Sequence, residues 1–432
     1  MVEISLMAFG VLVLLLSLGV PLPYCFGGGL MVMTLLGGAT MKGTMLWGFT
    51  QMANPVLLAI PLFVLAGTVM SESGIAASLL KFVNTFVGRI RGGLGVVASV
   101  SCAIIGAISG SGLTGVAAIG PLLIPEMESR GYPRAYATAL VANSSILGLL
   151  IPPSVTMIVY GWVTDTSILA CFLATLGPGL LITFLFAVVN LVMSRNFPLI
   201  LEEPRSLSET LREGMRRTGH AVPALLMPVI ILGGIYGGIM TPTEAAAVAV
   251  IYALPVGFLI YRGLSFRSLL IAGKDSATAV GSIMIMILFS LMLSQIYVME
   301  SVPQALVEMI FQITDDRILL LILVNVFLFL IGMVVNDITA IILTAPLLLP
   351  LMEAIGISPI QFAAIMGVNT AMGGVTPPYA SILYMAARIG KVKFTEVIRP
   401  AMVLLIFGYL PVVFLTSFWS ELSLYLPRLL GY

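Results

Sequence analysis

The sequence predicts an all-α polytopic membrane protein built from two inverted repeats, and three observations support that prediction. Of its 432 residues, 59% are hydrophobic and 9% are charged, whereas a soluble globular protein carries about 25% charged residues. The apolar residues form long runs, and about 20 apolar residues suffice to cross a bilayer as a helix. Two regions in opposite halves of the chain repeat one pattern of prolines and glycines. The composition excludes an ordinary soluble enzyme and a disordered chain.

Charged and metal-binding residues are few. Twenty basic and 19 acidic residues give a formal net charge of +1, so the charge balance offers no basis for nucleic-acid binding. One histidine, His220, and three scattered cysteines leave too few ligands for a zinc or iron–sulfur centre, and they predict no disulfide framework (Cys25, Cys102 and Cys171). The sequence has no P-loop, HExxH or catalytic-triad motif. We therefore expect a transport protein that uses neither ATP nor a transition metal.

The apolar runs predict about ten membrane-crossing helices. The first run has no basic n-region and no A-x-A cleavage signal, so we interpret it as a span rather than a signal peptide. Segments 75–91 and 302–313 mix apolar and polar residues at helical spacing, which predicts amphipathic helices lying in the interface. The predicted crossings are residues 4–20, 22–36, 54–70, 135–162, 168–193, 221–239, 243–261, 277–297, 359–387 and 401–419.

Two further apolar stretches, 92–125 and 318–351, are too long for one span and too broken for a straight pair. Basic residues orient them, because cytoplasmic loops carry an excess of Lys and Arg. If all the basic segments lie in the cytoplasm, each stretch must enter and leave by the same face. We therefore predict two re-entrant hairpins, the first opening from the cytoplasm and the second from outside, with both chain ends outside. The basic segments hold 17 of the 20 Lys and Arg: 81–91, 130–134, 195–217, 262–274 and 388–399.

An internal repeat aligns the two hairpin regions at one constant offset and without a gap. Pro-Pro pairs, single prolines, glycines and a threonine coincide, and the charge map gives the two copies opposite orientations. That is the inverted-repeat plan of secondary transporters. We divide the chain into a first repeat at 1–194, a cytoplasmic linker at 195–220 and a second repeat at 221–432. The coinciding residues include Thr114 with Thr339, Pro121 with Pro346, Gly148 with Gly373, and Pro152-Pro153 with Pro377-Pro378.

Each Pro-Pro pair predicts a broken helix, one within 135–162 and one within 359–387. Proline lacks an N–H and clashes with the preceding turn, so two in a row interrupt the helix. The freed carbonyls need water, protein donors or a cation, since hydrocarbon satisfies none of them. Gly148 and the Gly373-Gly374 pair would allow another backbone to approach closely.

Small polar residues gather at the hairpin tips and at the helix breaks. Hydroxyls, amides and loose carbonyls are hard oxygen ligands, and the carboxylates are too few for a Ca²⁺ cage. The pattern favours two pseudo-symmetric Na⁺ sites, one for each hairpin and broken helix; the alternative is that these small residues only allow close helix packing. Asp337 is a carboxylate at membrane depth, so it is a functional candidate. It would bind a cation, relay a proton or organise the hairpin tip.

At these residues the chain resembles the large membrane (M) subunit of a tripartite ATP-independent periplasmic (TRAP) transporter. Four motifs carry the resemblance across most of the chain. One residue pair departs from it: a glycine is expected two residues after Pro378, where Tyr379-Ala380 follows. The motifs are Ala107-Ile-Ser-Gly-Ser-Gly, Gly148-Leu-Leu-Ile-Pro-Pro-Ser with Ile158-Val-Tyr-Gly, Thr241-Pro-Thr-Glu-Ala-Ala-Ala, and Val375-Thr-Pro-Pro.

The resemblance implies an elevator-type importer of small organic acids driven by a Na⁺ gradient in the bacterial inner membrane. It also implies a small membrane (Q) subunit and a periplasmic substrate-binding (P) protein as partners, with lipid around the chain. The first implied Na⁺ site comprises Ser109, Ser111, Gly148, Ile151 and Pro152. The second comprises Asn336, Thr339, Gly373, Thr376 and Pro377. Thr114 and Thr156 would face the substrate.

The main functional hypothesis is Na⁺-coupled import of an organic anion as the large subunit of a three-part system. With almost no Lys or Arg in the core, bound Na⁺ would supply the positive charge, and the coupling would be reciprocal. The alternative is a stand-alone Na⁺/dicarboxylate symporter of related architecture. An intramembrane enzyme is disfavoured because the sequence offers no nucleophile–base set, and a channel because broken inverted repeats suit alternating access. A sugar acid such as sialate, a C4-dicarboxylate and a sulfonate all remain open as substrates.

Overall fold

A computed structural model describes residues 2–38, 40–200 and 207–432. Within these ranges the chain forms helices and no β-strand, as predicted. In chain order the elements are α1 (Val2–Ser17), α2 (Leu22–Gly37), α3 (Met41–Met52), η1 (Pro55–Leu58), α4 (Ala59–Glu72), α5 (Ile75–Val87), α6 (Gly93–Ser109), α7 (Gly112–Ser129), α8 (Arg134–Ser145), η2 (Ile146–Leu149), α9 (Val155–Val163), α10 (Ile168–Met193), η3 (Ser194–Asn196), α11 (Leu207–Tyr236), α12 (Pro242–Pro255), η4 (Val256–Ile260), α13 (Phe266–Met299), α14 (Val302–Ile313), α15 (Arg317–Gly332), α16 (Asp337–Ala354), α17 (Pro359–Gly373), α18 (Ser381–Gly390), α19 (Phe394–Leu404), η5 (Leu405–Tyr409), α20 (Leu410–Phe418) and α21 (Glu421–Leu429).

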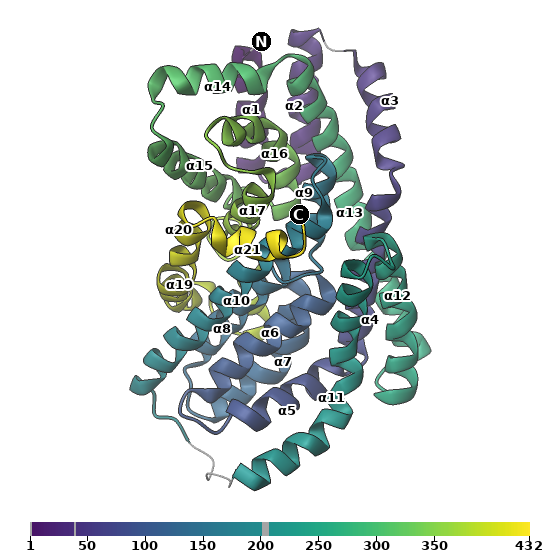
Figure 1. Cartoon of the computed structure of the whole chain (residues 1–432), viewed down its shortest axis with the longest axis vertical. Helices are drawn as coiled ribbons and strands as arrows, with labels where there is room; N and C mark the ends of the chain where they lie inside the picture. The colour runs from purple at the N-terminus through teal and green to yellow at the C-terminus, as the bar shows by residue number, and fades with distance from the viewer. Residues whose placement is uncertain (1, 39, 201–206) are drawn as a thin grey trace.

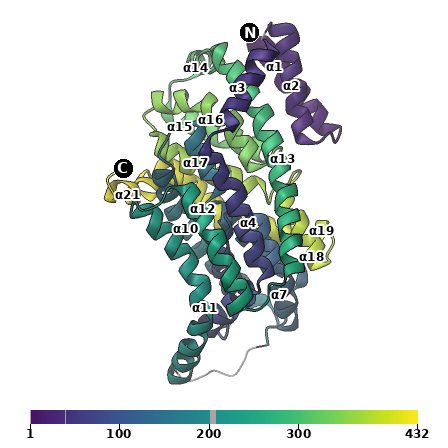
Figure 2. The same ribbon diagram turned by 90° about the vertical axis from the view of Figure 1, so that its right-hand side faces the viewer.

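The helices form an elongated bundle with one long side wall. Figure 1 shows α1, α2, α14, α15 and α16 toward one end and α5, α6 and α7 toward the other. We call α3, α4, α11, α12 and α13 the side wall; they run along the right-hand side of Figure 1 and face the viewer in Figure 2. The 34-residue α13 is about 50 Å long at 1.5 Å per residue. It packs against α2, α3, α4 and α16, so one helix connects the wall to the far end of the bundle.

Seven helices in the described part of the chain are long and apolar enough to cross a membrane, which supports the predicted membrane class. Shorter apolar helices, such as Gly93–Ser109 and Arg317–Gly332, lie beside them. The total of ten crossings stays a prediction. The seven candidate spans are Pro55–Glu72, Ile168–Asn196, Arg217–Tyr236, Pro242–Ile260, Phe266–Met299, Asp337–Ala354 and Phe394–Phe418.

Two helical hairpins form at the predicted places. The first pairs α6 with α7 and the second pairs α15 with α16. The second arms, α7 and α16, are both 18 residues long, and their bounds, Gly112–Ser129 and Asp337–Ala354, are related by the same offset as the sequence repeat. Each arm contains two prolines at matching places, Pro121 and Pro125 in α7 and Pro346 and Pro350 in α16.

Both predicted broken helices are interrupted at their Pro-Pro pairs. The first consists of α8, the short 3-10 turn η2 and, after residues 150–154, α9. The second consists of α17 and, after residues 374–380, α18. The Pro152-Pro153 and Pro377-Pro378 peptide bonds are both cis. The side chain of Ser154 restarts the first helix, because its Oγ accepts a hydrogen bond from the N–H of Met157 (3.4 Å).

The two halves of the chain contact each other through their hairpins and broken helices. The hydroxyl of Tyr160 in α9 donates a hydrogen bond to the carbonyl of Pro359 (2.8 Å). The guanidinium of Arg134 at the start of α8 donates to the carbonyl of Gly390 at the end of α18. Helices α8 and α18, α9 and α16, and α10 and α17 are also in contact. We call the two hairpins, the two broken helices and α10 together the inner body, and it presents α6, α7 and α9 to α4 of the side wall.

Some elements differ from the expectation or extend it. The predicted amphipathic segments 75–91 and 302–313 form α5 and α14. The sequence does not predict helix α3, because this segment is only weakly apolar. The helix packs against α13 through small residues. A Cβ on Gly48 would lie 3.0 Å from the side chain of Leu288 in α13. The short terminal helix α21 was also not anticipated. Helix α11 begins at Leu207, inside the predicted linker 195–220; residues 201–206 of that linker lie outside the described residues.

Candidate functional site

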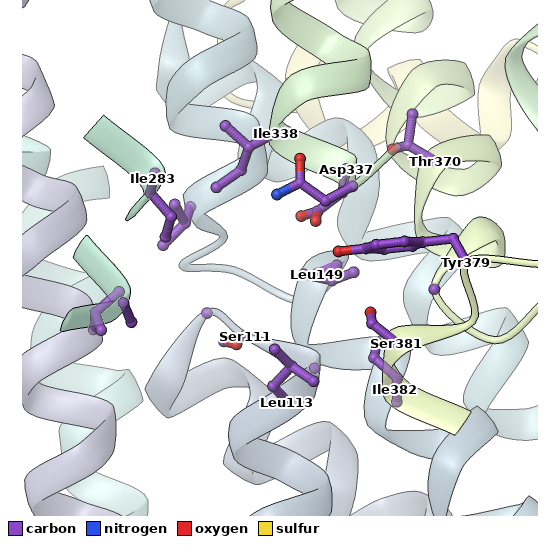
Figure 3. A pocket seen from close by; sticks show the side chains of 17 residues that line it. Ser111, Leu113, Leu149, Ile283, Asp337, Ile338, Thr370, Tyr379, Ser381 and Ile382 are labelled. Carbon is purple, nitrogen blue, oxygen red and sulfur yellow. The ribbon is translucent and has the colours of Figure 1, made fainter. Parts of the chain in front are cut away.

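A cavity of about 270 Å³ lies between the tips of the two hairpins. Figure 3 shows Ser111 and Leu113 on one side of it, Asp337 and Ile338 facing them, and Tyr379 and Ser381 reaching in from the second broken helix. Val64 of α4 and Ile283 of α13 close the cavity toward the side wall. Among its described lining residues there is no Lys, Arg or His. The polar side chains of the lining are Ser111, Asn336, Asp337, Thr370, Tyr379 and Ser381.

The tip of the first hairpin is a tight turn that requires glycine. Gly110 ends α6 with φ +61°, in the left-handed region that other residues rarely adopt. A Cβ on Gly110 would also lie 2.8 Å from the carbonyl oxygen of Pro153, so the turn sits directly against the first helix break. Ser109 stabilises the turn, because its Oγ donates a hydrogen bond to the carbonyl of Ser111 (3.3 Å).

The structure brings together three members of the first predicted Na⁺ set, Ser109, Ser111 and Gly148. A Cβ on Gly148 would lie 2.9 Å from the carbonyl oxygen of Ser111, so only a glycine allows this approach. The other two members, Ile151 and Pro152, are buried in the break that follows η2. The carbonyl of the break that approaches the hairpin tip is that of Pro153, one residue beyond the predicted pair.

The second hairpin tip contains a buried oxygen without a partner. Asn336 caps α16, with its Oδ1 accepting a hydrogen bond from the N–H of Thr339 (2.9 Å). The side chain of Thr339 is 0% exposed, and its Oγ1 has no hydrogen-bond partner. A buried hydroxyl without a partner costs about 1–3 kcal/mol. Such an oxygen is available to a cation that the hairpin tip would hold.

The second break is bound to the second hairpin through backbone atoms. The N–H of Tyr379 donates to the carbonyl of Met333 (3.0 Å) in the hairpin turn. Gly373 touches the end of α15 so closely that a Cβ there would lie 2.0 Å from the carbonyl oxygen of Gly332. Of the remaining predicted ligands, Thr376 donates its Oγ1 to the carbonyl of Met372 (2.8 Å), and Pro377 begins the cis pair.

Asp337 and Thr156 connect the two repeats beside the cavity. Thr156 Oγ1 donates a hydrogen bond to Asp337 Oδ2 (2.9 Å), and Thr156 is 1% exposed. Asp337 therefore has one carboxylate oxygen engaged by the first repeat while its side chain lines the cavity. Thr114, the other residue expected to face the substrate, lies in a separate small crevice with Gly67 and Ser109. The two threonines therefore do not share one cavity.

The two predicted Na⁺ sets and the predicted substrate pair leave out several residues of this site. Thr370, Tyr379 and Ser381 line the cavity, and the amide oxygens of Asn143 and Asn369 are buried without hydrogen-bond partners. The asparagines carried a signal, because each is an amide in an apolar helix a few residues before a Pro-Pro pair. Tyr379 carried none beyond its place in the Tyr379-Ala380 pair that departs from the family motif.

Ala380 occupies the backbone position where that glycine was expected. Its φ is +35° and its ψ is +39°, a left-handed conformation that costs about 1–2 kcal/mol for a residue with a Cβ. The local shape of the second break is thus the one that a glycine would favour, although the residue is alanine. The departure from the motif therefore leaves the backbone path in place and adds the Tyr379 ring to the cavity lining.

Comparisons with known proteins agree with this architecture. Residues 9–421 match the family model of the tripartite ATP-independent periplasmic transporter, DctM component. The chain is 34% identical over 387 residues to the C4-dicarboxylate TRAP transporter large permease protein DctM of Pseudomonas aeruginosa, covering 89% of this chain and 88% of the relative. It is also 34% identical over 414 residues to the isethionate TRAP transporter permease protein DctMQ of Oleidesulfovibrio alaskensis, covering 94% of this chain. The chain spans 65% of that longer relative.

A solved structure has the same fold. The crystal structure of the YdaH transporter of Alcanivorax borkumensis, described as having an unusual topology, superimposes with a TM-score of 0.57. The match covers 89% of each chain at 16% sequence identity. At that identity the likeness concerns the fold alone.

Proposed function

The chain belongs to the tripartite ATP-independent periplasmic transporter family, DctM component, and on that premise we propose that it is the large subunit of a Na⁺-driven importer of a small organic acid in the bacterial inner membrane. Members of this family are membrane transporters and not enzymes. The observation that carries the proposal is the cavity between the hairpin tips, which has no cationic side chain among its described lining residues and has buried, unpartnered oxygens nearby.

Na⁺ is the coupling ion that these oxygens fit. Hydroxyl, amide and carbonyl oxygens are hard ligands, suited to a hard cation. In the described residues no group of three His, Cys, Asp or Glu could hold a metal ion, so a softer or more highly charged metal has no comparable donor set. We assign one ion to Ser109, Ser111 and the break at Gly148–Pro152. We assign the second to Asn336, Thr339 and the break at Gly373–Pro377.

The organic acid would lie in the cavity between these two ions. A cavity without Lys or Arg cannot neutralise a carboxylate with side chains, so bound Na⁺ would supply that charge. Na⁺ and substrate would then favour each other's binding by the same factor, as linkage requires. Relatives of this chain carry names that specify C4-dicarboxylates and isethionate. We therefore propose an acid of that size range.

Two partners complete the transporter that we propose. The first is a small membrane (Q) subunit, and the second is a periplasmic binding protein (P) that delivers the acid. Uptake by the chain without partners would instead favour the stand-alone symporter.

We predict that uptake into proteoliposomes needs Na⁺ and both partners. With the large and small subunits reconstituted and the binding protein loaded with radiolabelled acid, replacing external Na⁺ by choline should reduce the initial rate at least about tenfold. Omitting the binding protein should reduce it to background. Equal rates in Na⁺ and choline would contradict the coupling, and robust uptake of free acid by the single chain would contradict the three-part assembly.

We further propose that the inner body moves as an elevator against the side wall. The positions of the helices in the two repeats support this. At the offset that places Pro121 on Pro346, α5 corresponds to α14, α7 to α16, and α10 to the α19–α20 pair. Inverted repeats of this kind expose a midplane site alternately to the two faces. The Pro-Pro breaks belong to the inner body, whereas α13 of the wall is a continuous helix of 34 residues.

Thiol labelling tests this motion. Leu113→Cys lies in the cavity lining and Lys42→Cys at the exposed start of α3, in a background from which the three buried cysteines, Cys25, Cys102 and Cys171, have been removed. A membrane-impermeant maleimide should label position 113 from one side only, and Na⁺ with loaded binding protein should change that rate about tenfold or more, since access requires a change of state. Labelling at position 42 should stay constant. Constant labelling at position 113 during active transport would favour local gating.

A further inference from the structure

We propose that a crevice beside the first hairpin binds one phosphatidylethanolamine molecule, with the lipid phosphate on Lys81 and the lipid ammonium on Glu126. The crevice has a volume of about 250 Å³ and lies between α5 and the two arms of the hairpin, α6 and α7. These helices lie at one end of the bundle (Figure 1). No described residue lines both this crevice and the cavity between the hairpin tips. The inference therefore depends neither on the transported acid nor on Na⁺ coupling.

Most of the crevice lining is apolar and suits hydrocarbon. The apolar residues are Ala77, Leu80, Leu94, Val97, Leu122 and Leu123. Leu122 is 43% exposed, and Phe86, further along α5, is 50% exposed. The apolar lining thus continues onto an apolar outer surface, which in a membrane protein is the surface that faces lipid. An acyl chain entering from the bilayer would remain in apolar surroundings along its whole path.

Three polar side chains line the same crevice. Lys81 and Asn84 lie on successive turns of α5, and Glu126 lies on α7. In the described part of the chain, Lys81 and Glu126 form no ion pair with each other. Arg217 of α11 brings a second positive charge to this place, because its guanidinium donates a hydrogen bond to the carbonyl of Lys81 (3.0 Å).

This arrangement of charges matches the headgroup of phosphatidylethanolamine. Lys and Arg attract a phosphate, and a carboxylate accepts hydrogen bonds from an ammonium. The headgroup joins one phosphate and one ammonium by a short chain, and both lie directly above the acyl chains. Lys81 belongs to α5, which the sequence predicts to lie in the membrane interface on the side of the basic segments. Headgroups occupy that depth.

The second repeat has a crevice at the corresponding place, with a volume of about 350 Å³, between α14, α15 and α16. At the offset that places Pro121 on Pro346, four lining residues of one crevice fall on four of the other. The space is therefore a repeated feature of the architecture rather than a local packing defect. The corresponding residues are Lys81 and Leu306, Leu122 and Leu347, Leu123 and Leu348, and Glu126 and Leu351.

The two crevices differ in polarity. All the described residues that line the second crevice are apolar, so it offers nothing that a headgroup would bind. The first has a lysine and a glutamate where the second has two leucines. A bound headgroup would also connect α5 to α7 of the inner body. Phosphatidylethanolamine would then stabilise the position of the hairpin in which Lys81 and Glu126 line one crevice.

Lipid titration of the delipidated complex of large and small subunits tests this inference. Native mass spectrometry in detergent counts bound lipids and gives their Kd. We expect phosphatidylethanolamine to bind with a Kd about fivefold to tenfold lower than phosphatidylglycerol or phosphatidylcholine with the same acyl chains. Phosphatidylglycerol lacks the ammonium, and the choline nitrogen has no N–H to donate. Glycerophosphoethanolamine has the same headgroup without acyl chains, and should bind at least about tenfold more weakly because the apolar lining stays unused.

Glu126→Gln should reduce the preference for phosphatidylethanolamine to less than about twofold, since the amide has no charge to attract the ammonium. Lys81→Gln should weaken phosphatidylethanolamine and phosphatidylglycerol alike, because both have the phosphate. Glu308→Gln is the matched control. It removes an exposed acid from α14, the helix that corresponds to α5, and should leave every Kd unchanged. Thermal unfolding of each variant without added lipid shows that it is folded.

Three results would overturn the inference. Equal binding of the three phospholipids, or an unchanged preference in Glu126→Gln, would mean that the crevice does not select a headgroup. Tightest binding of phosphatidylglycerol would make it a site for anionic lipid. Glycerophosphoethanolamine binding as tightly as the lipid would mean that the ligand is a soluble phosphate ester and that the apolar lining plays no part.

Discussion

Thr339→Val should abolish most of the stabilisation of this transporter by Na⁺ while leaving the Na⁺-free protein at least as stable as before. The substitution keeps the shape of the side chain and removes Oγ1, which is buried without a hydrogen-bond partner. In choline the free energy of unfolding should rise by about 1 kcal/mol, since a desolvated hydroxyl is lost. In Na⁺ the variant should lose one ligand, which weakens Na⁺ affinity about tenfold to a hundredfold. Thermal unfolding midpoints over a Na⁺ titration measure both effects.

Thr344→Val provides the matched control on the same helix. Thr344 is also buried and its hydroxyl donates to the carbonyl of Ala340 (2.6 Å), but it lies more than one helical turn beyond the hairpin tip and is not among the assigned Na⁺ ligands. Its Na⁺ titration should coincide with that of the wild type. A Thr339→Val protein with an unchanged Na⁺ titration would remove Thr339 from the ion site.

Gly373→Ala should destroy the packing of the second hairpin against its broken helix. The added Cβ would lie 2.0 Å from the carbonyl oxygen and 2.2 Å from the carbonyl carbon of Gly332. Both are backbone atoms, so α15 and α17 must separate for the methyl group to fit. Overpacking usually costs about 1–3 kcal/mol, and a clash between two backbones should exceed about 3 kcal/mol. We expect little monodisperse protein on gel filtration and no transport.

The neighbouring position separates this clash from a general intolerance of alanine. A Cβ on Gly374 would lie 3.0 Å from Cδ1 at the flexible end of Ile382 and at an ordinary contact distance, 3.4 Å, from the carbonyl oxygen of Ala371. Gly374→Ala should therefore express and unfold within about 1 kcal/mol of the wild type. Wild-type melting of Gly373→Ala would mean that the two helices do not approach as described.

Much of the fold follows from local rules that act on the sequence. Hydropathy predicts the long helices, and the proline pairs predict the breaks. Proline lacks the backbone N–H that a helix needs, so it interrupts a helix whatever the tertiary structure around it. The motif Thr241-Pro-Thr-Glu has a local cause as well, since Thr241 and Glu244 form a capping box at the start of α12. Helix α3 is not predicted because it is stabilised by packing against α13. Hydropathy contains no information about a contact with a segment so distant in sequence.

The sequence predicts which kinds of residue form the site, but it does not predict which of them contact one another. The hairpin tips and breaks could be recognised as polar residues in apolar sequence. Which of them face one cavity depends on how the repeats meet, and sequence spacing does not contain that information. Thr114 and Thr156 looked equivalent, yet only Thr156 reaches Asp337. Tyr379 enters the cavity because its own N–H is fixed by Met333, a contact between two segments that the sequence separates by the whole of α16 and α17.

The interlock of the two repeats makes it costly to move them separately. Sliding the hairpin and broken helix of one repeat without those of the other would break at least the bonds from Tyr160 to Pro359, from Arg134 to Gly390 and from Thr156 to Asp337. At about 1–3 kcal/mol for each group left unpaired, such half-moved molecules would amount to fewer than about one in a hundred. If Na⁺ binds at the tips as we propose, an ion at one tip would therefore favour the position that both tips share. Few molecules would then have one repeat moved and the other not.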